Sequence, residues 1–197
     1  AASDVYKRQL CREWMNQYPV VSLTLKRADK LTYKEAVESI QNLISEICTL
    51  HDEVLENANI KSRDRRLFQK LIDCETNETT LCSSLLTITR VLFQHYNKPV
   101  ILLIDEYDVP VAKAAERGYY DEMIVFMRGF LSDALKTNPY LKFGILTGAL
   151  RITKESIFTG LNNLDCFDIA NPKYADVFGF TQCEVDQMLF DLSLIHI

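Results

Sequence analysis

The order of hydrophobic and polar positions along this chain predicts strands and helices that follow one another in turn. Five consecutive aliphatic residues, Val100 to Ile104, are apolar on both faces and predict a strand buried in a parallel sheet. Phe143 to Gly148 predicts a second apolar strand, and Pro19 to Lys26, which alternates from Val21 onward, predicts a strand before both. A further short strand is expected at Phe167 to Ala170.

Helical periodicity fills the segments between these strands. Thr32 and Glu35 have the spacing of a capping box, in which the hydroxyl and the carboxylate satisfy free N–H groups at a helix start. Further helices are expected at Leu81 to Tyr96 and at Tyr120 to Lys136, and a second capping box, Thr181 to Glu184, predicts a last one. Strands that alternate with helices indicate an α/β fold with a mainly parallel sheet.

Composition and charge exclude several classes of protein. The 197 residues are 48% hydrophobic and 25% charged, as in ordinary globular domains, and the formal net charge of −5 gives no bulk indication of a nucleic-acid binder. No apolar run approaches the length of a membrane span. Residues 56 to 80 are polar, predict a helical insertion with loops, and hold one basic cluster that we interpret as a solvated helix face. The cluster consists of Lys61, Arg63, Arg65, Arg66 and Lys70.

Cysteine usage indicates a reducing compartment. No two of the six cysteines form a C-x-x-C pair, and no histidine follows at zinc-finger spacing. We therefore expect most of them to be small buried hydrophobes of a cytoplasmic protein. They are Cys11, Cys48, Cys74, Cys82, Cys166 and Cys183.

The two ends of the chain do not resemble native sequence of the domain. The sequence does not begin with Met, and both Ala1 to Gln9 and Ser193 to Ile197 resemble translated adapter read-through in assembled metagenomic data. We therefore expect a partial domain over residues 10 to 191, with non-native residues at 1 to 9 and 193 to 197, taken from a longer prokaryotic protein.

The candidate chemistry lies where the buried strand ends. Asp105 and Glu106 follow the aliphatic run directly, and Asp108 comes two residues later. Open α/β sheets bind ligands at the carboxyl ends of their strands, where one carboxylate can hold Mg²⁺ through water and a neighbouring one can orient an attacking water. The pleat directs Asp105 and Glu106 to opposite faces unless the backbone turns at the strand end. The simpler alternative is that these acids only mark where the chain reaches the surface.

Two more polar residues follow the next apolar strand. The hydroxyl of Thr147 is placed to contact a γ-phosphate or an attacking water, and Arg151, four residues later, is placed to reach a phosphate. The alternatives are a satisfied strand-end hydroxyl for Thr147 and, for Arg151, a surface charge or a partner of Asp105 or Asp108. Other chemistries lack their motifs, since the sequence holds no histidine cluster, no G-x-S-x-G, no G-x-G-x-x-G after a strand and no G-x-x-x-x-G-K-[ST] phosphate loop.

Taken together, these residues resemble a known family. Leu103 to Pro110 is similar to the Walker B segment of the AAA-ATPase-like proteins, which often carry a C-terminal PD-(D/E)XK nuclease-type domain. The resemblance extends from Trp14 to Phe190 and includes the segment Leu146 to Leu164, of which Thr147 to Leu164 is long and unusual. The other matching segments are Tyr18 to Val21, Gly118 to Met123, and Phe178 to Thr181 followed by Glu184 and Val185.

The resemblance implies the three-layer core of a P-loop ATPase, with the sheet order 5-1-4-3-2. Val20 to Leu25 would form strand 2, Val100 to Asp105 strand 3, Phe143 to Thr147 strand 4, and the region of Phe167 strand 5. The family's phosphate loop follows strand 1, which would lie upstream of the residues present here. Without strand 1, the middle of the sheet has an exposed pairing edge.

A function follows from the same resemblance. The parent protein would be a cytoplasmic, magnesium-dependent ATPase or ATP-driven switch that uses ATP and Mg²⁺. Asp105 would hold Mg²⁺ through water and Glu106 would activate the attacking water, with Asp108 in support. Thr147 would sense the γ-phosphate, and Arg151 would contact phosphate. Because the phosphate loop is missing, the 197-residue chain is expected to be inactive alone.

Two alternatives stay open at this point. One is a nucleotide switch or protein-interaction module that does not hydrolyse ATP and regulates an attached nuclease-like domain. The other is nuclease chemistry by the acidic cluster, which is disfavoured because no separated Asp with a Glu-x-Lys partner follows Asp105. Expected partners are ATP, the attached nuclease-like domain and a second copy of the chain, whereas this segment indicates neither a membrane nor a nucleic acid.

Overall fold

The computed structural model describes residues 2–149, 157–158, 164–168, 171 and 180–195. The chain divides into two compact units, Ala1–Leu161 and Asn162–Ile197. The first unit holds a sheet and most of the helices, and the second holds one described helix, α8 (Gln182–Ile195).

The sheet consists of three parallel strands in the order β1-β2-β3. They are β1 (Val20–Thr24), β2 (Val100–Asp105) and β3 (Leu141–Leu146). The central strand β2 is buried along most of its length, as its aliphatic run predicts. In β1 buried and exposed residues alternate, so this strand shows the period of a half-buried one. The observed order also agrees with the implied neighbours 2, 3 and 4 of the family's sheet.

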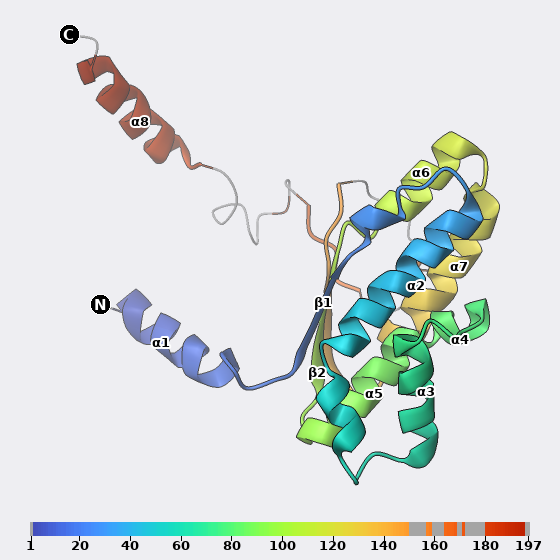
Figure 1. Ribbon diagram of the computed structural model, residues 1–197. Helices are drawn as coiled ribbons and strands as arrows, with labels where there is room; N and C mark the ends of the chain where they lie inside the picture. The colour runs from blue at the N-terminus through green and yellow to red at the C-terminus, as the bar shows by residue number, and fades with distance from the viewer. Residues whose placement is uncertain (1, 150–156, 159–163, 169–170, 172–179, 196–197) are drawn as a thin grey trace. The chain divides into compact units, whose positions relative to one another are not determined.

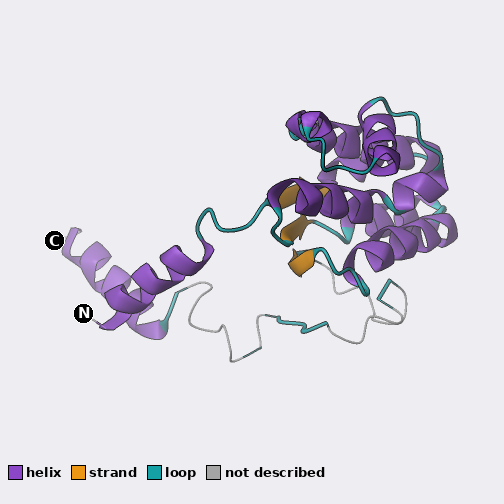
Figure 2. Ribbon diagram, turned by 90° about the horizontal axis from the view of Figure 1, so that it is seen from below, coloured by secondary structure: helices purple, strands orange, loops and turns teal. Residues whose placement is uncertain are grey.

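The helices α2 to α7 all cover one face of the sheet (Figure 1). In Figure 2 the three strands lie together beside the helices. Because the strands lie side by side in chain order, crossovers of one hand place every connecting helix on the same face. The helical segments are α1 (Ala2–Trp14), η1 (Leu25–Ala28), α2 (Tyr33–Thr49), η2 (Asp52–Glu56), α3 (Ser62–Ile72), α4 (Glu78–Cys82), α5 (Ser84–Tyr96), α6 (Val109–Arg117) and α7 (Tyr120–Leu135).

The core fills the space between the sheet and three helices, with α2 against β1, α5 against β2 and α7 against β3. Phe126 and Phe130 stack on successive turns of α7 with their ring centroids 5.8 Å apart. Burial of such side chains is the main favourable contribution to folding. The other largest fully buried side chains are Phe68, Leu25, Ile40, Ile44, Leu71, Leu81, Leu85, Ile88, Leu92 and Leu102.

Both predicted capping boxes are confirmed. The Thr32 hydroxyl accepts from the N–H of Glu35 at 3.3 Å, and the Glu35 carboxylate accepts from the N–H of Thr32 at 3.1 Å. At the start of α8, Thr181 and Glu184 exchange the same pair of bonds at 3.4 and 2.8 Å. These signals are local, because all the bonding groups lie within one helical turn.

The strand expected at Phe143 to Gly148 is observed at Leu141–Leu146. Two other predicted elements are divided or end early. The helix expected at Leu81 to Tyr96 is divided at Ser83, because Asn77 caps an earlier start by accepting from the N–H of Thr80 at 2.9 Å. The first strand stops at Thr24, whose hydroxyl accepts from the N–H of Lys26 at 3.4 Å and begins η1. In both cases a side chain with a hydroxyl or amide oxygen satisfies the backbone and starts a helix.

The α/β class with a parallel sheet is confirmed. Within the described residues of the first unit, α2 to α7 supply one helical layer on one face of the sheet, and the third layer of the expected core stays a prediction. The strand expected at Phe167 to Ala170 is absent at Phe167 and Asp168, and its last two residues lie outside the described part of the chain. None of the helices in the described ranges is long and apolar enough to cross a membrane.

The cysteines are free, but the expectation that most of them are buried is wrong. Only Cys48, on the inner side of α2, is buried. Cys11, Cys166 and Cys183 are exposed, and two others are half-buried. Apolar context in the sequence therefore does not by itself predict burial, because α1 and α8 leave their cysteines at the surface.

Candidate functional site

Three oxygen-bearing side chains end the three strands at one edge of the sheet. Thr24, the last residue of β1, pairs with Asp105, the last residue of β2. Thr147 directly follows β3, and its N–H donates to the carbonyl of Ile104 at 2.9 Å. The carboxyl ends of parallel strands are where open α/β sheets bind ligands. Asp105 and Thr147 were predicted from the sequence, whereas Thr24 was not.

An extra residue in β3 determines which side chain stands beside Asp105. Val100 pairs with Leu141 and Ile101 pairs with Phe143, so that Lys142 has no partner in the pairing register. After this irregularity Ile104 pairs with Leu146, which leaves Thr147 beside Asp105. A regular register would instead place Leu146 there, since a slip of one residue changes every neighbour.

The Asp105 carboxylate is held in place by two hydrogen bonds that both end on Oδ1. The hydroxyl of Thr147 donates one of them. The N–H of Glu106 donates the other at 3.0 Å. Both Asp105 and Thr147 are exposed to solvent. The two bonds fix the direction of the carboxylate while its other oxygen, Oδ2, takes part in neither.

The backbone turns sharply at Glu106, as the sequence analysis required if two adjacent carboxylates are to serve one site. Its φ is +53°, in the left-handed region that residues other than glycine rarely adopt. Such strain persists only where the surroundings impose it, and it is frequent at functional sites. Here the N–H of Tyr107 donates to the carbonyl of Thr147 at 3.1 Å, which holds the turn against the end of β3.

The loops after β2 and β3 approach each other closely at Gly148. A Cβ at this position would lie 2.5 Å from Oδ1 of Asp108 and 2.9 Å from Cε1 of Tyr107. Asp108 is buried, with 3% of its surface exposed, at the residue before α6. The ring of Tyr107 in turn packs on that of Phe158 at 5.4 Å. Gly148 is therefore a site residue that was not predicted from the sequence. A glycine directly after a strand could have indicated it, because such a glycine often marks a close approach of two backbone segments.

Replacing Gly148 by Ala is expected to lower the free energy of unfolding by about 1–3 kcal/mol, because the new methyl group overlaps Asp108 and Tyr107. Urea denaturation of the 197-residue chain measures this loss. The matched control is Ala149→Ser at the next, exposed position, which is expected to change stability by less than about 0.5 kcal/mol. A Gly148→Ala variant as stable as the control would show that the two loops are not in contact.

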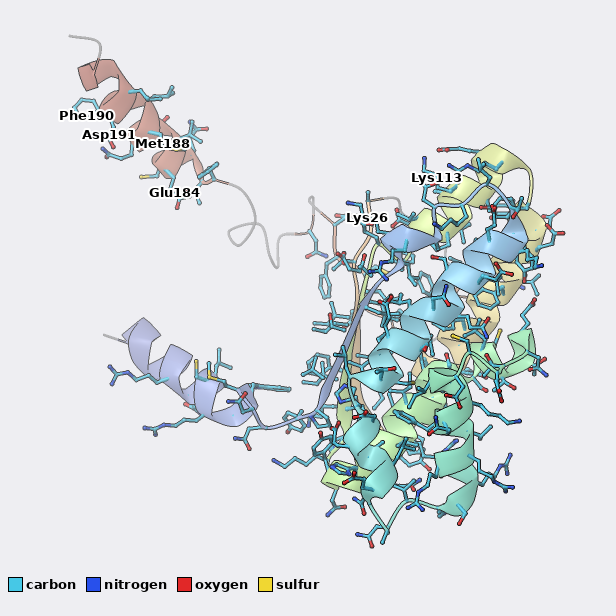
Figure 3. The ribbon with its side chains drawn as sticks, in the orientation of Figure 1. Lys26, Lys113, Glu184, Met188, Phe190 and Asp191 are labelled. Carbon is cyan, nitrogen blue, oxygen red and sulfur yellow. The ribbon has the colours of Figure 1, made fainter. Side chains whose placement is uncertain are left out.

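Two lysines lie at the same end of the unit. Lys26 belongs to η1, directly after β1, and Lys113 belongs to α6, which follows β2 (Figure 3). A hydrogen bond from Lys113 to Glu116 at 2.8 Å raises the pKa of the lysine, so its charge persists. These cations were not identified from the sequence, because no motif marks them.

The remaining predicted residues are placed as follows. Asp108 occupies the N-cap position of α6, but its side chain makes no capping hydrogen bond there. Glu106 lies in the turn after Asp105 and is half-buried. Arg151 lies outside the described residues, so its expected contact with phosphate stays a prediction. Asp105 and Thr147 are thus the predicted pair that the structure brings into direct contact.

The donor set at this edge fits magnesium better than a softer metal. Mg²⁺ is usually held by one or two carboxylates together with waters and substrate phosphates, and it demands oxygen ligands. Asp105 supplies a fixed, exposed carboxylate to which the Thr147 hydroxyl donates, and Thr24 is the residue that pairs with Asp105 in the strand register. In the described part of the chain, no three His, Cys, Asp or Glu residues come together as a metal cluster.

Comparisons with known proteins bear on this site. A family model described as "Predicted AAA-ATPase" matches residues 3–158, which include Asp105 and Thr147. A curated protein of Azotobacter chroococcum mcd 1, named "Uncharacterized protein in vnfD 5'region", is 24% identical over 175 residues. The aligned part is 88% of this chain but only 30% of that relative. No solved structure matches the chain.

Proposed function

Because the chain belongs to the AAA-ATPase-like family, we propose that it forms part of an ATP site in a longer, magnesium-dependent ATPase. The observation that carries the proposal is the fixed Asp105 carboxylate, which bonds to the Thr147 hydroxyl and the Glu106 N–H at the carboxyl edge of the sheet. ATPases need positioning and charge compensation at this place more than covalent chemistry. The hydrolytic activity, ATP and Mg²⁺ all belong to the proposal.

Asp105 is the residue that would hold magnesium. Oδ1 is engaged by two protein donors, so Oδ2 is the oxygen that would bond to a water of the metal. When bound, the metal would offset the charge that develops on the phosphate oxygens. The protein's own contribution is a carboxylate that does not have to reorient when nucleotide arrives, because its partners already fix it.

Glu106 is the residue that would orient the attacking water. A carboxylate adjacent to the metal ligand can accept a proton from water, and the turn at Glu106 takes it out of the strict alternation of the strand. Thr147 would exchange its bond to Asp105 for one to a γ-phosphate and so report whether the phosphate is present. Arg151 would contact the same phosphate.

The phosphate-binding loop would come from a preceding segment of the longer protein. The sequence given holds no G-x-x-x-x-G-K-[ST] motif, and the family's sheet order would add strand 1 beside β3. Since the chain spans about 30% of the curated relative, an attached nuclease-like domain and assembly with a second copy also belong to the proposal.

The Thr147 hydroxyl provides the test of this proposal. In the longer protein, Thr147→Val is expected to lower the ATP turnover number about tenfold or more, because the donor to Asp105 and phosphate is lost at nearly constant volume. Thr147→Ser keeps the hydroxyl and is expected to stay within about threefold of the parent. Steady-state phosphate release measures both variants. Equal activity of Thr147→Val and the parent would contradict the role given to this residue, and an inactive parent would favour the non-hydrolysing switch.

A further inference from the structure

The helix α3 carries a row of cations on one side. Arg63, Arg66 and Lys70 are spaced three and four residues apart, so they lie on one stripe of the helix. At 1.5 Å per residue the stripe is about 10 Å long. Lys61 stands directly before the first turn. We call these four residues the α3 basic face.

The rest of α3 explains why these cations remain at the surface. The opposite side of the helix buries Phe68, which has no exposed surface, and Leu71, which has 2% exposed. The acid in its first turn, Asp64, is only 5% exposed and points to α5, where it pairs with Arg90 at 3.0 Å. Gln94 donates to the other oxygen of the same carboxylate at 2.8 Å. Asp64 is thus engaged by α5, where Arg90 balances its charge.

The four residues of the α3 basic face are exposed, and within the described part of the chain none of them forms an ion pair. Two neighbouring hollows of about 270 and 180 Å³ open on this face and share Arg63. The larger is lined by Lys61, Arg63, Asp64 and Arg90, and the smaller by Arg63, Arg66, Leu67 and Lys70. Both hollows are therefore lined mainly by cations on a chain whose net charge is negative.

We propose that the α3 basic face binds the phosphate backbone of a nucleic acid. Two arginines flanked by two lysines suit phosphate oxygens, because a guanidinium group can donate two parallel hydrogen bonds to one phosphate. No aromatic residue is exposed on α3 for base stacking. The contact is therefore expected to recognise the phosphate backbone of the nucleic acid and not its base sequence. The proposal goes beyond the sequence-based interpretation of the cluster as a solvated helix face, with which the exposure of all four residues agrees.

Two other occupants fit the face less well. A membrane surface is bound by amphipathic helices that insert several exposed apolar side chains, whereas on α3 Phe68 and Leu71 are buried in the core and Leu67 and Ile72 are half-buried. An acidic protein would need apolar or aromatic anchors at the centre of the contact, and between Leu50 and Tyr96 no large hydrophobic residue of the described chain is exposed. A polyanion without apolar groups is the occupant that the surface fits.

The α3 basic face lies away from the carboxyl edge of the sheet, with α3 and α6 at opposite ends of the helical layer (Figure 1). The test can therefore be made on the 197-residue chain without ATP, and its outcome is independent of the proposed ATP site. Fluorescence anisotropy of a labelled DNA duplex measures binding between about 50 and 200 mM salt. With four phosphate contacts, the logarithm of the affinity is expected to fall against the logarithm of salt with a slope of about −3 to −4.

A triple variant removes three of the four cations: Arg63→Gln, Arg66→Gln and Lys70→Gln. It is expected to bind the duplex at least about tenfold more weakly than the parent at about 100 mM salt, and the slope of its salt dependence is expected to be near −1. The matched control is a second triple variant with the same change in net charge at exposed positions elsewhere: Lys34→Gln, Lys98→Gln and Lys136→Gln. It is expected to bind like the parent. Thermal unfolding of all three proteins shows whether the fold is kept. Equal weakening by both variants would overturn the proposal, because it would show only a general charge effect.

Two competitors distinguish the sources of negative charge. Polyglutamate at the same charge concentration is expected to displace the duplex poorly, since its carboxylates lack the geometry and density of the phosphate backbone. Vesicles that contain phosphatidylserine are expected not to bind the chain measurably. Displacement by polyglutamate as effective as by unlabelled duplex would assign the face to an acidic protein, and vesicle binding that is lost in the triple variant would assign it to a membrane. Either result would overturn the proposal.

Discussion

Replacing Glu106 by Gln in the longer protein is expected to lower the ATP turnover number by about 100-fold or more while ATP still binds. Gln keeps the size of the side chain and its hydrogen-bonding oxygen, but it cannot accept a proton from the attacking water. The left-handed turn at this residue is retained, because it depends on the backbone bonds to the end of β3. Turnover under saturating ATP measures the loss, and calorimetry measures the affinity that remains.

The control for Glu106→Gln is Glu122→Gln, an exposed carboxylate in the first turn of α7 that the proposal does not use. It is expected to leave turnover within about twofold of the parent. Undiminished hydrolysis by Glu106→Gln would remove this residue from the reaction. The acid next to the metal ligand would then only mark the point where the chain reaches the surface.

Replacing Phe130 by Ala is expected to lower the free energy of unfolding by about 3–5 kcal/mol. Phe130 has no exposed surface and stacks on Phe126 at 5.8 Å. Truncation removes the buried ring and leaves a cavity that α7 cannot close, because α7 is already tightly packed against α4 (a Cβ on Gly129 would lie 3.3 Å from Sγ of Cys82). Domains of this size are stable by only about 5–15 kcal/mol, so much of the stability would be lost.

Urea denaturation of the 197-residue chain measures the effect of Phe130→Ala. The matched control on the same helix is Val125→Ala, because Val125 is 65% exposed. Its expected loss is below about 0.5 kcal/mol. Losses of equal size in the two variants would show that α7 does not pack on the core through the Phe126 and Phe130 side.

Several parts of the fold are determined by local sequence and could be predicted from it. The aliphatic run of β2 predicts a buried strand in a parallel sheet, and β2 is buried along most of its length. The capping boxes at Thr32 and Thr181 bond within a single turn, so their residues are sufficient to place the helix starts. The candidate residue Asp105 follows from the same logic, since it directly ends the buried strand.

Other parts depend on contacts between distant residues, which single-sequence patterns do not contain. Thr147 stands beside Asp105 only because Lys142 is an extra residue in β3, and nothing in the alternation of that strand marks it. The role of Gly148 depends on how closely two loops approach, which is a property of the assembled sheet. The predicted helix is divided at Ser83 because Asn77 caps a separate, earlier helix start. The sequence alone does not show whether this cap or the apolar periodicity determines where the helix begins.

The proposed ATP site depends on Asp105 as the magnesium-holding carboxylate, and this role is tested by the magnesium dependence of ATP hydrolysis by the longer protein. Asp105→Asn keeps an oxygen that can accept from Thr147 and from the N–H of Glu106, but it removes the charge. In Asp105→Asn the Mg²⁺ concentration for half-maximal activity is expected to rise about tenfold or more, whereas Asp73→Asn, at the exposed end of α3, is expected to leave it unchanged. An unchanged magnesium dependence in Asp105→Asn would contradict the account.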